Sequence, residues 1–147
     1  MPPIRVLVVD DSVVVRKVLC EALASDPALE VAGTAADGAS ALNSLQVVQP
    51  DIILLDVEMP VMDGLATLRL LRQRWSRIPV IMCSSLTQRG AKVTIEALAC
   101  GAADYVTKLS GQSDRETAMR KLAQELIPKI HALIKRPTEP PLSLIHI

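Results

Sequence analysis

The sequence has few aromatic residues: no phenylalanine, one tryptophan and one tyrosine. Valine, leucine, isoleucine and alanine must therefore pack most of the core, and 147 residues are enough for one domain with such a core. The cysteines are also few and odd in number, and they lie inside apolar segments at Cys20, Cys83 and Cys100. We therefore expect buried free thiols in a reducing compartment, rather than a disulfide or a zinc site.

Neither sign of charge is in excess, since 16 lysines and arginines balance 16 aspartates and glutamates. Bulk charge thus gives no support for nucleic-acid binding. Half of the residues are apolar, yet no apolar run approaches the length of a membrane span. The chain passes from Pro2-Pro3 into an apolar run without a signal-peptide pattern. We expect a cytoplasmic domain.

Four short apolar runs each lead into a reactive side chain. Continuous aliphatic runs of this length, separated by helical stretches, are typical of parallel strands that are covered on both faces. The pairs of run and side chain are 6–9 with Asp10-Asp11, 52–55 with Asp56, 80–83 with Ser84, and 105–107 with Lys108.

Strand and helix patterns alternate five times along the chain, which predicts an α/β fold with a doubly wound parallel sheet. The segment 30–35 is less apolar than the other strands and is expected at the sheet edge. Gly101 is suited to a left-handed helix cap, and Ser113 with Glu116 forms a capping box that predicts the start of the last helix. The strands are expected at about 5–9, 30–35, 52–55, 80–83 and 105–107, with a helix after each.

In an open α/β sheet, ligands bind beyond the carboxyl ends of the strands. Three carboxylates, a hydroxyl and an ammonium should therefore meet at one edge of this sheet. Three carboxylates in one pocket repel each other strongly without a cation, and hard oxygen ligands suit Mg²⁺. With a lysine added, the site can hold a phosphoryl group on an aspartate, which indicates signalling by phosphorylation.

The motifs resemble the receiver domain of two-component response regulators over about residues 4–135. The resemblance implies a flavodoxin-like (βα)5 fold with strand order 2-1-3-4-5. The residues that carry it are Asp10-Asp11, Asp56 followed by Met59-Pro60 and Asp63-Gly64, Ser84, and Gly101-Ala102 before Lys108.

Within this family, the chain resembles the regulatory half of the chemotaxis protein-glutamate methylesterases (CheB). The similarity rests mainly on Glu58 and on Ser84-Ser85-Leu86-Thr87, together with 104–108. It implies a CheA-like histidine kinase as phosphodonor and, as further partners, an esterase domain and chemoreceptors.

The resemblance also implies a role for each site residue. Asp56 would be the phosphoacceptor nucleophile, and Lys108 would pair with a phosphoryl oxygen. Mg²⁺ would be held by Asp10, Asp11, Asp56 and the backbone carbonyl of Glu58. Ser84 would be the switch hydroxyl, and Tyr105 the aromatic residue that repacks with it.

Simpler interpretations stay open for some of these residues. An acidic pair before a helix often serves as its N-cap, and either Asp11 or Ser12 is well placed for this. Tyr105 could be a half-buried strand tyrosine with its hydroxyl in water, and a switch role would not exclude this. Leu109 stands where receivers usually have proline, so a trans peptide bond is expected there, because a non-proline cis bond costs about 2.5–4 kcal/mol.

The end of the sequence has a different composition. Residues 136–141, with Pro137-Thr138-Glu139-Pro140-Pro141, are expected to begin a semi-rigid interdomain linker. Residues 142–147 resemble the translation of a library-preparation adapter and are expected to be a non-native tail.

Three classes of function remain to be weighed. The first is the regulatory fragment of a methylesterase, and the second is a stand-alone receiver that binds a partner when phosphorylated. The third, a complete enzyme, finds no hydrolase site: Gly38-Ala39-Ser40-Ala41-Leu42 lacks the second glycine of a nucleophile elbow. Any methylesterase or glutamine deamidase activity would therefore belong to a longer parent protein.

Overall fold

The computed structural model describes residues 2–84, 88–108 and 114–134, except for the side chains of residues 88 and 89. The strands are β1 (Ile4–Val9), β2 (Leu29–Ala35), β3 (Ile52–Asp56), β4 (Val80–Ser84) and β5 (Asp104–Thr107). The helices are α1 (Val13–Ala24), α2 (Gly38–Val48), α3 (Gly64–Arg74), α4 (Gln88–Ala99) and α5 (Arg115–Leu133). Leu109, Ser113, the expected linker 136–141 and the expected tail 142–147 lie outside the described residues.

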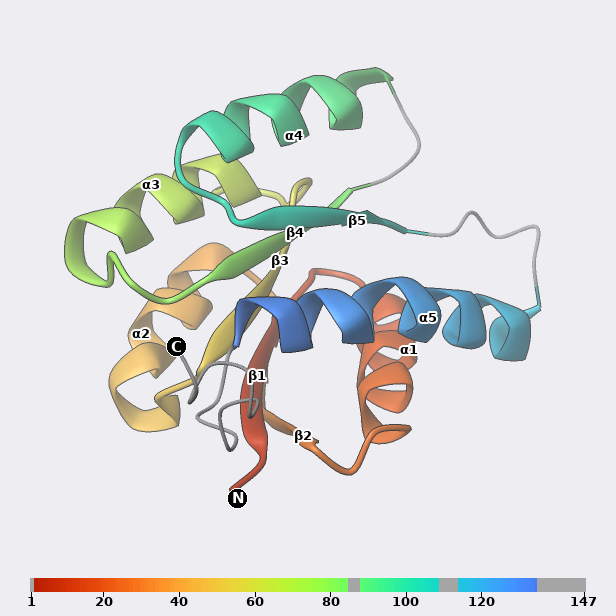
Figure 1. Ribbon diagram of the computed structural model, residues 1–147. Coiled ribbons are helices and arrows are strands. Elements are labelled where there is room, and N and C mark those ends of the chain that lie inside the picture. Colours follow the sequence, from red (N-terminus) through yellow and green to blue (C-terminus); the bar gives the residue numbers. More distant parts are fainter. Residues whose placement is uncertain (1, 85–87, 109–113, 135–147) are drawn as a thin grey trace, which may run out of the picture.

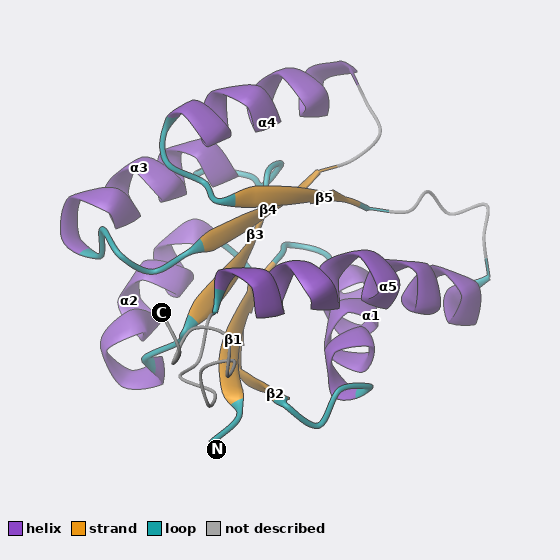
Figure 2. Cartoon of the chain, in the orientation of Figure 1, coloured by secondary structure: helices purple, strands orange, loops and turns teal. Residues whose placement is uncertain are grey.

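All five strands are parallel, in the order β2-β1-β3-β4-β5, which confirms the predicted fold class and the edge position of β2. Helices α1 and α5 cover one face of the sheet, and α2, α3 and α4 cover the other (Figures 1 and 2). Because the chain leaves every strand at the same edge, the loops at the five carboxyl ends converge.

Alternation along the buried strands divides each apolar run between two cores, since successive side chains point to opposite faces. Leu7 and Val9 join the core shared with α2, α3 and α4, whereas Val6 and Val8 join the core shared with α1 and α5. The same division continues through β3 and β4, which explains why these strands are apolar at every position before their last residue. All three cysteines are free thiols, but only Cys83, in the second core, is buried as predicted, since Cys20 and Cys100 are partly exposed.

Helix ends follow the local rules with one correction. Ser12 rather than Asp11 caps α1, with its side chain accepting a hydrogen bond from the Val15 amide. The capping box that predicted Ser113 as the cap of the last helix was wrong by one residue, because Asp114 caps α5 by accepting from the Thr117 amide. Gly101 has a φ of 104°, so the predicted left-handed cap after α4 is confirmed.

Candidate functional site

The side chains predicted to meet at the carboxyl edge of the sheet do lie there. Asp10 follows β1, Asp56 and Ser84 end β3 and β4, and Lys108 follows β5. The Lys108 ammonium lies 2.6 Å from Oδ1 of Asp56 and 2.7 Å from Oδ2 of Asp10. The parallel sheet therefore brings together three charged groups that are far apart in the sequence.

Both acidic partners of Lys108 are buried to an unusual degree, with 0% of Asp10 and 1% of Asp56 exposed. Backbone amides orient one oxygen of each: Ser12 donates to Oδ1 of Asp10, and Glu58 donates to Oδ1 of Asp56. The Oδ2 atoms of Asp10 and Asp56 are buried and accept no hydrogen bond within the described part of the chain, although that of Asp10 is in ionic contact with Lys108. Buried carboxylate oxygens that accept no hydrogen bond are costly to the fold and indicate a functional site.

Burial shapes the protonation of this cluster. Burial raises the pKa of Asp56 to about 7, while the Lys108 ammonium opposes the rise and the charge of Asp10 adds to it. Burial alone would lower the pKa of Lys108, but its contacts with Asp10 and Asp56 outweigh burial and raise that pKa. The lysine is therefore held firmly as a cation beside two crowded carboxylates.

The donor set of the site fits a hard divalent cation. One oxygen from each of Asp10, Asp11 and Asp56 lies within 4.8 Å of the other two. Asp11 is exposed, whereas the other two are buried, so one side of the cluster is open to solvent. Three carboxylates lie beside one lysine here, and the Oδ2 of Asp56, which accepts no hydrogen bond from the described residues, is available to a cation that prefers oxygen.

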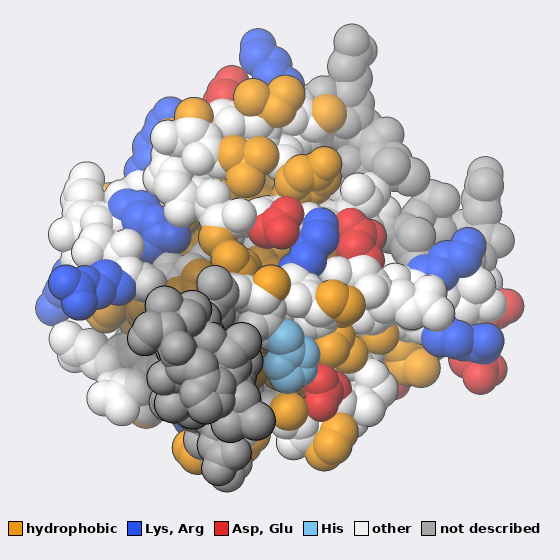
Figure 3. Space-filling view, in the orientation of Figure 1, with side chains coloured by type: hydrophobic (Ala, Val, Ile, Leu, Met, Phe, Trp, Pro, Cys, Tyr) orange, Lys and Arg blue, Asp and Glu red, His pale blue; other side chains and the backbone are white. Residues whose placement is uncertain are grey.

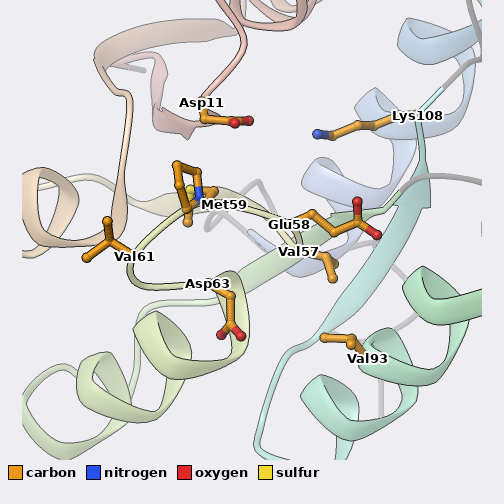
Figure 4. A pocket seen from close by; sticks show the side chains of 9 residues that line it. Asp11, Val57, Glu58, Met59, Val61, Asp63, Val93 and Lys108 are labelled. Carbon is orange, nitrogen blue, oxygen red and sulfur yellow. The ribbon is translucent and has the colours of Figure 1, made fainter.

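A pocket of about 530 Å³ opens next to the cluster. Figure 4 shows Asp11 and Lys108 pointing toward one another across it. Asp63 also lines the pocket, but its side chain caps α3 by accepting from the Ala66 amide. The lining residues are Asp11, Val57, Glu58, Met59, Pro60, Val61, Asp63, Val93 and Lys108.

Gly64 fixes the backbone that carries Asp56. A Cβ atom at Gly64 would lie 2.1 Å from the backbone oxygen of Asp56 and 2.9 Å from Cα of Val57. Only a residue without a side chain permits this approach, in which the Gly64 amide also donates to the Val57 carbonyl at 3.0 Å. The Asp63-Gly64 motif thus starts α3 and presses it against the end of β3.

Ser84 and Tyr105 lie on the neighbouring strands β4 and β5. Ser84 is buried and its carbonyl accepts from the Lys108 amide at 2.7 Å, which places it beside the charged cluster. Tyr105 is 44% exposed, and the ammonium of Lys129 lies 5.0 Å from the centre of its ring. Sequence reasoning missed Lys129, since only the tertiary structure brings α5 next to this strand.

The described helices include none that is both long and apolar enough to cross a membrane.

Comparison with known families gives one domain match. The response regulator receiver domain matches residues 6–121. A protein-glutamate methylesterase/protein-glutamine glutaminase of Nocardioides sp. is 46% identical over 136 residues, covering 92% of this chain and 37% of the relative. The protein of the same name from Pyrococcus abyssi is 50% identical over 134 residues, covering 91% of this chain and 36% of the relative. The chain therefore spans less than two fifths of the length of these curated relatives.

A solved structure is similar over nearly its whole length. The response regulator domain of Thermotoga maritima CheB has a TM-score of 0.79 and 41% identity, and the match covers 92% of this chain and 99% of that one. Vibrio cholerae chemotaxis protein CheY4 is also similar, with a TM-score of 0.65 and 31% identity, over 84% of this chain and 99% of that one.

Proposed function

This chain belongs to the response regulator receiver domain family, and we propose that Asp56 is the residue at which it accepts a phosphoryl group from a histidine kinase. The observation that carries the assignment is the position of Asp56. Its carboxylate is buried at the strand end, is oriented by the Glu58 amide, and contacts Lys108 at 2.6 Å. No other carboxylate within the described residues combines these contacts with an unpartnered oxygen beside two further aspartates.

The chemistry proposed for Asp56 is nucleophilic. A carboxylate oxygen of Asp56 attacks the phosphorus of a phosphohistidine, an O–P bond forms as the N–P bond breaks, and the released imidazole takes up a proton. Lys108 holds a phosphoryl oxygen as a point charge, which compensates negative charge as the group arrives. Asp10 keeps Lys108 in place through its contact at 2.7 Å.

We further propose that Mg²⁺ is the cofactor, held by the side chains of Asp10, Asp11 and Asp56 and by the backbone carbonyl of Glu58. The clustered carboxylate oxygens and the unpartnered Oδ2 of Asp56 support this ligand set. When bound, the ion supplies charge neutralisation between the carboxylates and the incoming phosphoryl oxygens.

The switch is assigned to Ser84 and Tyr105. Ser84 would move to donate a hydrogen bond to the phosphoryl group, and the ring of Tyr105 would repack with it. Support comes from the burial of Ser84 beside Lys108 and from the partial exposure of Tyr105 on the neighbouring strand. Two packings that differ in this way form the bistable element that a phosphorylation switch requires.

The output is proposed from the relatives. A CheA-like histidine kinase in the cytoplasm would supply the phosphoryl group, and a methylesterase domain acting on chemoreceptor glutamates would be the regulated partner. The names of the relatives and the match to the CheB response regulator domain support this proposal. Phosphorylation would shift the equilibrium between a covered and an open esterase site.

The direct test is phosphorylation by a small donor. Incubation with acetyl phosphate and Mg²⁺ should add one phosphate, which intact-mass spectrometry detects as the labile acyl phosphate. Asp56→Asn should abolish this product, a loss of more than about a hundredfold, because the amide keeps the shape but lacks the nucleophilic anion.

Glu96→Gln is the matched control, since it changes a carboxylate to an amide on the exposed side of α4. It should label like the parent chain. Phosphate that still adds to Asp56→Asn would show that another residue is the acceptor.

A further inference from the structure

Lys129 on α5 makes three contacts with the edge strand β5 and one with its own helix. Its ammonium lies 5.0 Å from the centre of the Tyr105 ring and 2.5 Å from the Tyr105 carbonyl oxygen. It also lies 3.5 Å from a carboxylate oxygen of Asp104 and 3.5 Å from one of Glu125. Acidic and basic side chains lie close together near the middle of the face shown in Figure 3.

The topology explains why a residue of α5 reaches this ring. Among the described strands, β5 pairs with β4 alone and forms the sheet edge, so carbonyl groups on its outer side are open to other donors. Val106 points into the core shared with α1 and α5, and the adjacent Tyr105 therefore points to the other face. Lys129 must extend past the edge strand to contact both the ring and the carbonyl of Tyr105.

The contacts of this cluster contribute little to the free energy of folding. Its ion pairs are partly exposed, with 27% of the Lys129 side chain accessible, and such pairs contribute little to folding. What the contacts do fix is the position of Tyr105, since the backbone and the ring are held by the same ammonium. While the ring of Tyr105 points outward to solvent, it stays in contact with the Lys129 ammonium. If the ring turns inward toward the protein, that contact is lost.

We infer that Lys129 is a positioning residue that holds Tyr105 outward and thereby opposes the repacking that accompanies phosphoryl binding. This inference rests on the proposed function of Asp56, Ser84 and Tyr105. If the phosphorylated state requires an inward ring, the contact of the Lys129 ammonium with the ring stabilises only the other state. By linkage, removal of Lys129 must then raise the affinity of the site for a phosphoryl group or its mimic.

The experiment uses the only tyrosine of the chain as its reporter. The full chain is labelled with 3-fluorotyrosine, and the ¹⁹F resonance of residue 105 is followed during titration with beryllofluoride in the presence of Mg²⁺. Lys129→Met removes the charge but keeps much of the stem, and Lys129→Gln is a second route if methionine disturbs the fold. Lys129→Arg retains a cation over the ring, and Lys121→Met removes an exposed lysine from the same helix.

In Lys129→Met, the ¹⁹F resonance should move toward its beryllofluoride-bound position before any ligand is added. Beryllofluoride should bind about two to five times more tightly, the size expected for loss of an exposed cation–π contact. Lys129→Arg and Lys121→Met should behave like the parent chain. Unchanged or weaker binding by Lys129→Met and Lys129→Gln, with an unchanged free resonance, would overturn the role of Lys129.

Failure of the proposed function gives a different result in this experiment from failure of the inference about Lys129. If the parent chain itself shows no change at residue 105 with beryllofluoride and Mg²⁺, the assignment of the switch to Tyr105 fails, and the inference about Lys129 fails with it. If the resonance of the parent chain changes with beryllofluoride but the Lys129 variants behave like the parent chain, only the inference about Lys129 is wrong.

Discussion

Arg72 at the amino end of the sheet and Asp56 at its carboxyl end both carry charge into the protein, but their surroundings differ. The Arg72 guanidinium donates to the carbonyl oxygens of Trp75, Ile78 and Gly101 at 3.2, 2.7 and 2.9 Å. It thereby joins the end of α3 to the segments that precede β4 and β5. Asp56, in contrast, lies among like charges and keeps one buried oxygen without a hydrogen bond.

The difference shows what each end contributes. At the amino end, burial lowers the pKa of Arg72, but three backbone carbonyl groups accept hydrogen bonds from its cation, and the result is a connection between loops. At the carboxyl end, burial and neighbouring charge disfavour the ionised carboxylate of Asp56, which raises its pKa. Charged groups whose surroundings shift their pKa in this way are typical of functional sites, where a residue serves the chemistry at a cost to stability.

The largest stability loss is expected at the carboxyl end, from Gly64→Ala. The added Cβ would meet the Asp56 backbone oxygen at 2.1 Å, and backbone atoms cannot move aside as a side chain can. We expect a loss of about 3 kcal/mol in the free energy of unfolding, measured by urea denaturation. Labelling of Asp56 by acetyl phosphate should also slow.

Gly33→Ala is the control for Gly64→Ala, because the nearest atoms to a Cβ there belong to side chains, of Val48 at 3.3 Å and of Leu7 at 3.5 Å. It should cost less than about 1 kcal/mol. Equal losses of stability in the two variants would mean that the close approach of Gly64 to the Asp56 backbone does not cause the loss.

Arg72→Met tests the amino end. The substitution keeps an apolar stem but leaves three carbonyl groups without their charged donor, so we expect a loss of about 2 kcal/mol in the free energy of unfolding. Arg69→Met, on the exposed side of the same helix, should change it by less than about 0.5 kcal/mol. Acetyl phosphate labelling should be unaffected. A strong loss of labelling would contradict the idea that the amino end serves stability alone.

Val61→Asn should stabilise the carboxyl end. Val61 is fully exposed and has a φ of 69°, a left-handed conformation that a β-branched residue adopts only with strain. Asparagine tolerates this conformation, so we expect a gain of about 0.5–1 kcal/mol. Val47→Asn, at an exposed position within α2, should give no gain. A similar gain there would mean that removing an exposed valine, and not relieving backbone strain, stabilises the protein.

The smallest effect is expected at Asp26, near the amino end of β2. A hydrogen bond with His131 at 2.8 Å, and then one from the Ala28 amide, lower the pKa of Asp26. The folded state thus favours the carboxylate, and its contribution to stability is complete above the unfolded pKa of about 4 and is lost as the pH falls through the lower folded pKa.

Asp26→Asn should therefore be less stable than the parent chain by under about 1 kcal/mol at pH 5, with the difference shrinking as the pH approaches 3. Urea denaturation at both pH values provides the measurement. A difference that grows on acidification would contradict the sign of the pKa shift.

Local sequence patterns were enough for much of the fold. The apolar runs and the helix patterns between them predicted a helix after each strand, the edge position of β2 and the cap at Gly101. The cap of α5 was predicted less well, because Ser113 and Asp114 are adjacent and both are good caps. Only the folded backbone shows that the side chain of Asp114 accepts from the Thr117 amide.

By itself, the sequence determined that Asp10, Asp56, Ser84 and Lys108 end at one edge of a parallel sheet, because apolar runs that alternate with helices form parallel strands whose carboxyl ends share one edge. It did not determine that Lys108 contacts Asp10 as well as Asp56, or that α5 places Lys129 over Tyr105. These contacts depend on how far neighbouring strands are offset and on how a helix packs across the sheet. Such quantities are set by the packing of the two cores, so only the tertiary structure decided them.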